Sequence, residues 1–167
     1  MFRVPIASLP DGLHHETLHP SADDLDLDPE TFSDVAVDLR LDIAERRVLA
    51  AYTVSATARL TCDRTLDDYD QPVEGAHAVL FTADAAVAEG EPDDDTRPLP
   101  DDATALDLTE SVRDTLLLAL PLRRVSPAAQ AAEIPSQFGG PDEGEPADDR
   151  WAALQALRRA DPAPDSD

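Results

Sequence analysis

Alternating apolar and polar positions dominate the middle of the chain. From residue 33 to residue 43, apolar side chains occupy every second position, and a second alternation runs from residue 48 to residue 62. A short polar connection over residues 44–47 separates the two runs. A period of two is typical of a strand with one buried face, and two such runs joined by about four residues predict an antiparallel hairpin. Its predicted buried face comprises Val35, Val37, Leu39, Leu41, Ile43, Val48, Ala50, Tyr52, Val54, Ala56, Ala58, Leu60 and Cys62.

Weaker alternations predict further strands. A third run over residues 75–81 has the same period, and we expect Pro72 and Gly75 to interrupt its beginning. Residues 2–6 also alternate, and a further strand is expected after Gly12. Together these patterns predict an antiparallel sheet of about five or six strands, either open or partly closed.

A Leu-rich helix is predicted after the strands. It begins after Asp107, which together with Glu110 resembles a capping box, and it ends at Pro121. Leu117 and Leu118 widen its apolar stripe, so we expect its last turns to be buried on most sides. With the sheet, this helix predicts an α+β fold. The stripe itself consists of Leu108, Val112, Leu116 and Leu120.

Pro-rich and acidic stretches divide the chain into segments. Residues 1–122 are predicted to form a single α+β domain. Within it, residues 89–102 are predicted to be a flexible acidic linker, because they bury too little apolar surface to fold alone. Residues 123–147 are expected to be poorly ordered.

A short C-terminal helix is predicted over residues 148–160. It carries Trp151, Leu154 and Leu157 on one side, so we expect it to dock on the domain. Residues 161–167 are predicted to be a disordered tail, since they are acidic and follow two prolines.

The charge balance is extreme. The chain has 36 acids against 13 bases, a net charge of −23, and every base is an arginine. Such a surface repels itself at low salt, and the repulsion is screened when the Debye length falls to about 3 Å near 1 M. Halophilic adaptation to concentrated intracellular salt would explain it, and so would a specialised acidic surface for a basic partner. Composition alone does not separate these two explanations.

The sequence also bears on location. No stretch reaches the roughly 18 apolar residues that span a bilayer. The N-terminal residues lack the apolar segment of a signal peptide. We therefore expect a cytoplasmic protein.

Histidine and cysteine offer limited candidate chemistry. In an extended chain His14 and His15 point to opposite faces, and His15 and His19 lie roughly 13 Å apart, too far for one ion. A site completed by His77 from another strand is the remaining metal hypothesis. Cys62, the single cysteine, falls in the apolar phase of its strand and is expected to be a buried structural thiol. Since no phosphate loop or nucleophile motif is present, we expect neither an enzyme nor a cofactor.

Basic residues supply a candidate contact surface. Guanidinium groups would bind phosphates, and an indole would stack on a base. The competing interpretation is that the tryptophan docks its own helix while the arginines cap carbonyl groups or pair with acids. The candidate RNA or partner contacts are Arg123, Arg124, Trp151, Arg158 and Arg159.

Three short segments occur in the order of a known family. They are Leu-Thr-Cys-Asp-Arg-Thr-Leu over residues 60–66, an acidic helix ending in Leu-Ala-Leu-Pro at residue 121, and Asp-Arg-Trp-x-x-Leu-x-x-Leu over residues 149–157. In this the chain resembles the YceD family of large ribosomal RNA subunit accumulation proteins. Many relatives carry a second cysteine at the place of Thr65 and further cysteines after the Leu-Pro, an arrangement that looks like a zinc site. With one cysteine, this chain is expected to be free of metal.

The resemblance implies a function. By this resemblance, the protein is expected to be a non-enzymatic factor that supports accumulation of large-subunit ribosomal RNA during ribosome biogenesis and acts by binding. The implied partner is precursor large-subunit ribosomal RNA or a basic ribosomal protein, and neither a membrane nor DNA. The alternative is an acidic interaction protein, or a chaperone for a basic partner, unrelated to ribosomal RNA.

Overall fold

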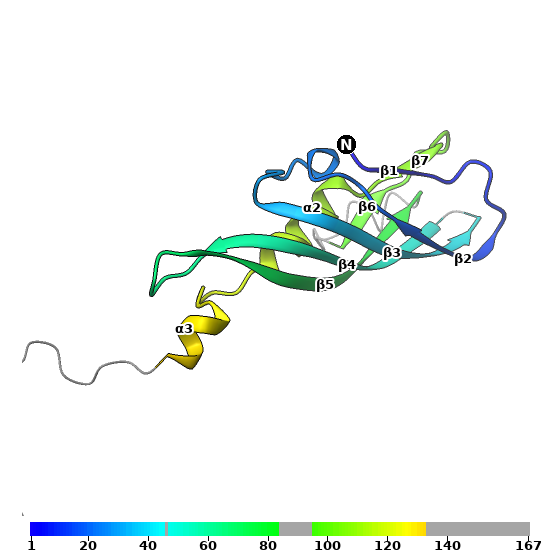
Figure 1. Ribbon diagram of the computed structural model, residues 1–167. Helices are drawn as coiled ribbons and strands as arrows, with labels where there is room; N and C mark the ends of the chain where they lie inside the picture. Colours follow the sequence, from blue (N-terminus) through cyan, green and yellow to red (C-terminus); the bar gives the residue numbers. More distant parts are fainter. Residues whose placement is uncertain (46, 84–94, 133–167) are drawn as a thin grey trace, which may run out of the picture. The chain divides into compact units, whose positions relative to one another are not determined.

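The structure, a computed structural model, describes residues 1–45, 47–83 and 95–132 (Figure 1). In these ranges the fold is mixed α+β, with a five-stranded, mostly antiparallel sheet, a two-stranded sheet and two α-helices. Met1–Ala131 form one compact unit. This unit therefore extends past the predicted domain boundary at residue 122.

The larger sheet has the strand order β2-β3-β4-β5-β6, and β1 pairs with β7 in the smaller sheet. The core lies between one face of the larger sheet and the segments that cover it, chiefly helix α2 and the short 3-10 helix η1 (Figure 1). The elements are β1 (Arg3–Pro5), β2 (Gly12–Leu18), η1 (Asp23–Leu25), β3 (Phe32–Ala44), β4 (Arg47–Thr61), β5 (Asp68–Thr82), β6 (Thr96–Pro98), β7 (Ala105–Asp107), α2 (Thr109–Leu118) and α3 (Pro127–Ala131).

The predicted hairpin is confirmed as β3 and β4. The two strands pair antiparallel from Phe32 opposite Ala58 to Ala44 opposite Arg47, so they extend further into the connection than the sequence indicated. The predicted apolar face is buried, except that Ile43 is only partly covered. Period-two alternation was a strong signal here because one face of the sheet meets the core and the other meets solvent.

Strand β5 is longer than predicted. It begins at Asp68, so neither Pro72 nor Gly75 interrupts it. Among the described residues, the first part of β5 pairs with β4 on one side and with no strand on the other. Pro72 is tolerated there because the N–H group that proline lacks would point to the unpaired side. Gly75 lies under α2, where there is no room for a side chain.

The helix predicted up to Pro121 is α2, and its capping differs from the predicted box. Asp107 Oδ1 accepts hydrogen bonds from the Thr109 N–H at 3.1 Å and the Thr109 hydroxyl at 2.7 Å. The Glu110 carboxylate instead accepts a hydrogen bond from Arg97 at 3.1 Å. Glu110 thus ties α2 to a neighbouring segment and does not close the capping box.

The expectation that the last turns of α2 are buried on most sides is wrong. Leu116 is fully buried, but Leu117 is 44% exposed and Leu118 is 86% exposed. Helix α2 lies on a single sheet, so only one of its faces is covered in the part of the chain that the structure describes (Figure 1).

The structure also differs from the predicted flexible linker over residues 89–102. Thr96–Pro98 form β6, which pairs parallel with the end of β5. The Leu80 N–H donates to the Asp95 carbonyl at 2.7 Å, and the Leu99 N–H donates to the Thr82 carbonyl at 2.8 Å. This segment is ordered by pairing with a distant strand, which its own composition does not reveal. Residues 89–94 lie outside the described residues.

The segment predicted to be poorly ordered, 123–147, begins with structure. Its first part contains α3, and the remainder lies outside the described residues. The predicted C-terminal helix over 148–160 and the tail over 161–167 lie outside them as well.

Candidate partner-binding site

The β4–β5 turn and the segment after α2 are joined at one end of the β4–β5 hairpin (Figure 1). The Asp63 N–H donates to the Arg124 carbonyl at 2.7 Å, and the Arg124 N–H donates to Asp63 Oδ2 at 2.9 Å. This reciprocal pair of hydrogen bonds connects residues that are 61 positions apart. It brings the predicted contact residue Arg124 beside the turn that begins at Cys62.

Cys62 lies at the centre of this junction. Its side chain is fully buried and forms a small apolar cluster with Val125 and Ala129, as expected for a structural thiol. Hydrogen bonds from the Thr65 hydroxyl and from the Ser126 N–H, whose nitrogen is 3.4 Å from Sγ, stabilise the thiolate. They outweigh the opposing effect of burial and lower the pKa of Cys62 to about 6. The thiol therefore holds two segments together.

Helix α3 is fixed to the same turn. The Ala129 N–H donates to the Ser126 hydroxyl oxygen at 3.2 Å, which caps the helix. The guanidinium of Arg64 donates to the Ala129 carbonyl, so one end of Arg64 is structural. The position of α3 thus depends on side chains of the turn.

The outer surface of this junction carries charge and apolar groups. Arg123 and Arg124 are exposed, and their guanidinium groups form no ion pair with the described residues. Two leucines are exposed beside the arginines: Leu66, at 77%, and Leu122, which is fully exposed. We call the surface formed by Arg64, Leu66, Leu122, Arg123 and Arg124 the arginine end.

The acids near the arginine end are partly engaged. Asp63 accepts the hydrogen bond of Arg124, and Asp68 forms an ion pair with Arg59 at 3.4 Å. Asp67 is also exposed in this turn, so the arginine end mixes arginines with carboxylates in a chain whose net charge is −23. Chemically, it can contact phosphate groups through guanidinium and apolar surfaces through leucine.

Of the predicted contact residues, the structure places Arg123 and Arg124 at the arginine end. Trp151, Arg158 and Arg159 lie outside the described residues. Sequence reasoning missed Arg64, Leu66 and Leu122. The available signal was the segment over residues 60–66, which contains Arg64 and Leu66 but was used only as the end of a strand and as one of the segments that resemble the family.

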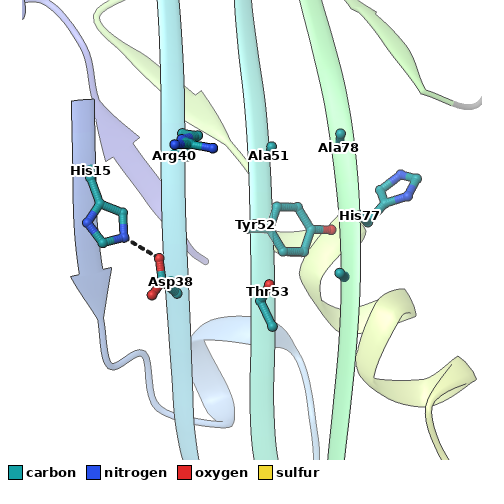
Figure 2. A pocket seen from close by; sticks show the side chains of 9 residues that line it. His15, Asp38, Arg40, Ala51, Tyr52, Thr53, His77 and Ala78 are labelled. Atoms are coloured by element: carbon teal, nitrogen blue, oxygen red, sulfur yellow. Dashed lines mark hydrogen bonds and ion pairs between the residues drawn. The ribbon is translucent and has the colours of Figure 1, made fainter. Parts of the chain in front are cut away.

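A second candidate is a shallow hollow of about 760 Å³ on the outer face of the sheet (Figure 2). Figure 2 shows His15 on β2 directed at Asp38 on β3, with which it forms a hydrogen bond, and Arg40 beside them. Ala51 and Ala78 line the hollow between the strands. In the described residues this histidine bonds to no hydroxyl or thiol group, so the hollow offers a binding surface but no nucleophile–base pair.

The histidines do not converge on one another. His14 contacts the Pro10 carbonyl at 2.7 Å, whereas His15 pairs with Asp38 on the outer face. His77 is on β5, where it pairs with Asp95 at 2.9 Å and packs edge-on against Tyr52. Within the described ranges, no group of three or more His, Cys, Asp or Glu side chains is arranged to hold a metal ion.

The described helices also bear on membrane insertion. None of them has the length and apolar character to cross a bilayer.

Comparisons with known proteins identify the family. Residues 50–158 match the family model described as large ribosomal RNA subunit accumulation protein YceD. The chain is also 30% identical over 144 residues to the uncharacterized protein YlbN of Bacillus subtilis (strain 168), covering 82% of this chain and 81% of that protein. No solved structure matches significantly. The family match extends over both the β4–β5 turn and the segment after α2, and the chain belongs to the YceD family of large ribosomal RNA subunit accumulation proteins.

Proposed function

We propose that this protein supports the accumulation of large-subunit ribosomal RNA during ribosome biogenesis, acting in the cytoplasm by binding and not by catalysis. The observation that carries this proposal is the match of residues 50–158 to the family model. That match includes the arginine end, whose exposed side chains suit contact with a partner better than chemistry on a substrate.

The partner at the arginine end is precursor ribosomal RNA in this proposal. Exposed guanidinium groups bind phosphate oxygens. Arg123 and Arg124 are exposed and form no ion pair with the described residues. Leu66 and Leu122 provide apolar surface for unstacked bases beside them.

The function is tested by the ratio of large- to small-subunit ribosomal RNA in cells that lack the gene. We expect a lowered ratio that the wild-type gene restores. An unchanged ratio in the deletion strain, under both optimal and stressed growth, would contradict the proposal.

The site is tested in the same strain with two charge-reversed variants. Arg123→Glu/Arg124→Glu changes the arginine end, and Arg3→Glu/Arg47→Glu changes two exposed arginines on β1 and β4 by the same charge. We expect the control to restore the ratio and the first variant to fail, although both accumulate to wild-type levels. Full restoration by both would refute the RNA contact at this end.

Cross-linking of tagged wild-type protein in cells identifies the partner. We expect large-subunit precursor RNA to be recovered, with less recovered from Arg123→Glu/Arg124→Glu. Recovery of a basic ribosomal protein, without RNA, would favour the chaperone alternative and refute direct RNA binding.

A further inference from the structure

Strand β2 leaves one side of the sheet open. Among the described residues it is the terminal strand of the larger sheet and pairs only with β3, from Gly12 opposite Ile43 to Leu18 opposite Val37. Among the described residues, no backbone hydrogen bond joins residues 12–18 to any segment other than β3. Because an antiparallel strand directs alternate N–H and C=O groups to either side, the outward groups of β2 are available to another strand.

The two open edges of the sheet differ in how they are protected. Along its unpaired half, β5 carries Pro72 together with the acids Asp70 and Glu74, and proline and charge both discourage strand addition. Strand β2 has no proline and no bulge, and its register with β3 is continuous over seven residues. It also exposes 68% of Leu13. Of the two edges, β2 is the one suited to receive a strand.

A side-chain pocket adjoins β2. A hollow of about 340 Å³ is lined by His14 and Glu16 of this strand and by Leu9, Leu39 and Leu41. Leu39 and Leu41 belong to the core, and Leu9 packs against it, so the floor is apolar. The volume is near the lower end of ligand pockets, which hold roughly 300–1,000 Å³, and suits a side chain of a peptide.

An open edge beside a side-chain pocket is the arrangement by which a sheet binds an extended peptide. Backbone hydrogen bonds supply affinity, and the pocket selects a side chain. The charge around the edge indicates which peptide fits. Arg40 is the one arginine on β2 and β3, so acids outnumber bases at this edge and a basic peptide fits it. The exposed acids there are Asp11, Glu16, Asp38 and Asp42.

We infer that the β2 edge binds an extended basic segment of another protein, which adds a sixth strand to the sheet and inserts one apolar side chain into the hollow with the apolar floor. A second copy of this chain fits less well, because β2 has no Arg or Lys and each copy carries a net charge of −23. The inference goes beyond the proposed RNA contact and is independent of it, since the two use different elements.

The test uses the full chain and a synthetic peptide in which Lys alternates with Val or Thr around one central Leu. Labelled peptide is titrated by fluorescence anisotropy, and amide hydrogen exchange is measured with and without it. We expect the peptide to slow exchange within residues 12–18. A peptide with alternate amides N-methylated has the same charge but cannot pair along one edge, and we expect it to bind at least about tenfold more weakly.

Two variants locate the site. Glu16→Lys reverses charge beside the hollow, and the matched control Glu74→Lys reverses charge on the protected β5 strand. We expect about tenfold weaker binding for Glu16→Lys and less than about twofold change for Glu74→Lys. Equal binding of the N-methylated peptide, equal effects of both variants, or protection outside β2 would overturn the inference.

Self-association is a separate outcome. If sedimentation shows a dimer without peptide, and residues 12–18 become protected as protein concentration rises, the occupant is a second copy and the inference is wrong. The peptide measurements use no RNA, so their outcome is independent of the ribosomal RNA ratio. Peptide binding can be absent while gene deletion still lowers the ratio, and peptide can bind while gene deletion leaves the ratio unchanged.

Discussion

At the scale of single residues, Gly75 sets the distance between β5 and α2. A Cβ atom at this position would lie 2.7 Å from the Thr115 Cγ2 atom and 3.2 Å from the Thr115 carbonyl oxygen. Thr115 is itself held in place, because its hydroxyl donates to the Ser111 carbonyl at 2.8 Å and lies 3.1 Å from the Tyr52 hydroxyl. The Ser111 bond lies within α2 and fixes the Thr115 side chain, and moving the helix away would break the contact with Tyr52.

Gly75→Ala is therefore expected to destabilise the protein by about 1–3 kcal/mol, the usual cost of overpacking. Thr115→Ser keeps the hydroxyl and removes the methyl group that the new Cβ would meet. In the Gly75→Ala/Thr115→Ser double variant, part of the lost stability should return, which urea unfolding measures. A Gly75→Ala protein as stable as wild type would show that α2 packs less closely than described.

At the scale of elements, α2 has one buried and one exposed face. Leu116 is fully buried against the sheet, whereas Leu118, two positions later, is 86% exposed. A helix advances about 100° per residue, so residues two apart lie on nearly opposite sides. Composition alone could not distinguish the leucines of this run.

Leu116→Ala should lower the free energy of unfolding by about 2–5 kcal/mol, because it leaves a cavity in the core. Leu118→Ala removes the same atoms from the surface and should change the free energy of unfolding by less than about 0.5 kcal/mol. Denaturant unfolding of both variants measures the difference. Similar losses from the two variants would contradict the orientation of α2.

At the scale of the whole molecule, charge opposes the compact state. Thirty-six acids against 13 bases leave a net charge of −23, and the described ion pairs lie on the surface, where each contributes little. Repulsion among exposed carboxylates therefore acts against folding and is relieved by screening.

Raising sodium chloride from about 0.01 M to 1 M shortens the Debye length from about 30 Å to 3 Å and should raise Tm. Each kcal/mol of relieved repulsion corresponds to roughly 2–8 °C for a domain of this size. Calorimetry in sodium and potassium chloride provides the measurement, and the two salts should act alike. An unchanged Tm would mean that the acids are spaced too widely to repel one another.

The sequence by itself determined the local patterns: the β3–β4 hairpin with its buried face, the presence of a helix ending before Pro121, and the burial of Cys62. These follow from periodicity, which reports whether a segment has one covered face. The tertiary structure decided what depends on distant partners. Pairing with β5 makes Thr96–Pro98 a strand, the proximity of α2 explains Gly75, and the hydrogen bonds of Asp63 bring Arg124 to the turn. Such contacts join segments far apart in the chain, and no local pattern encodes which of them will meet.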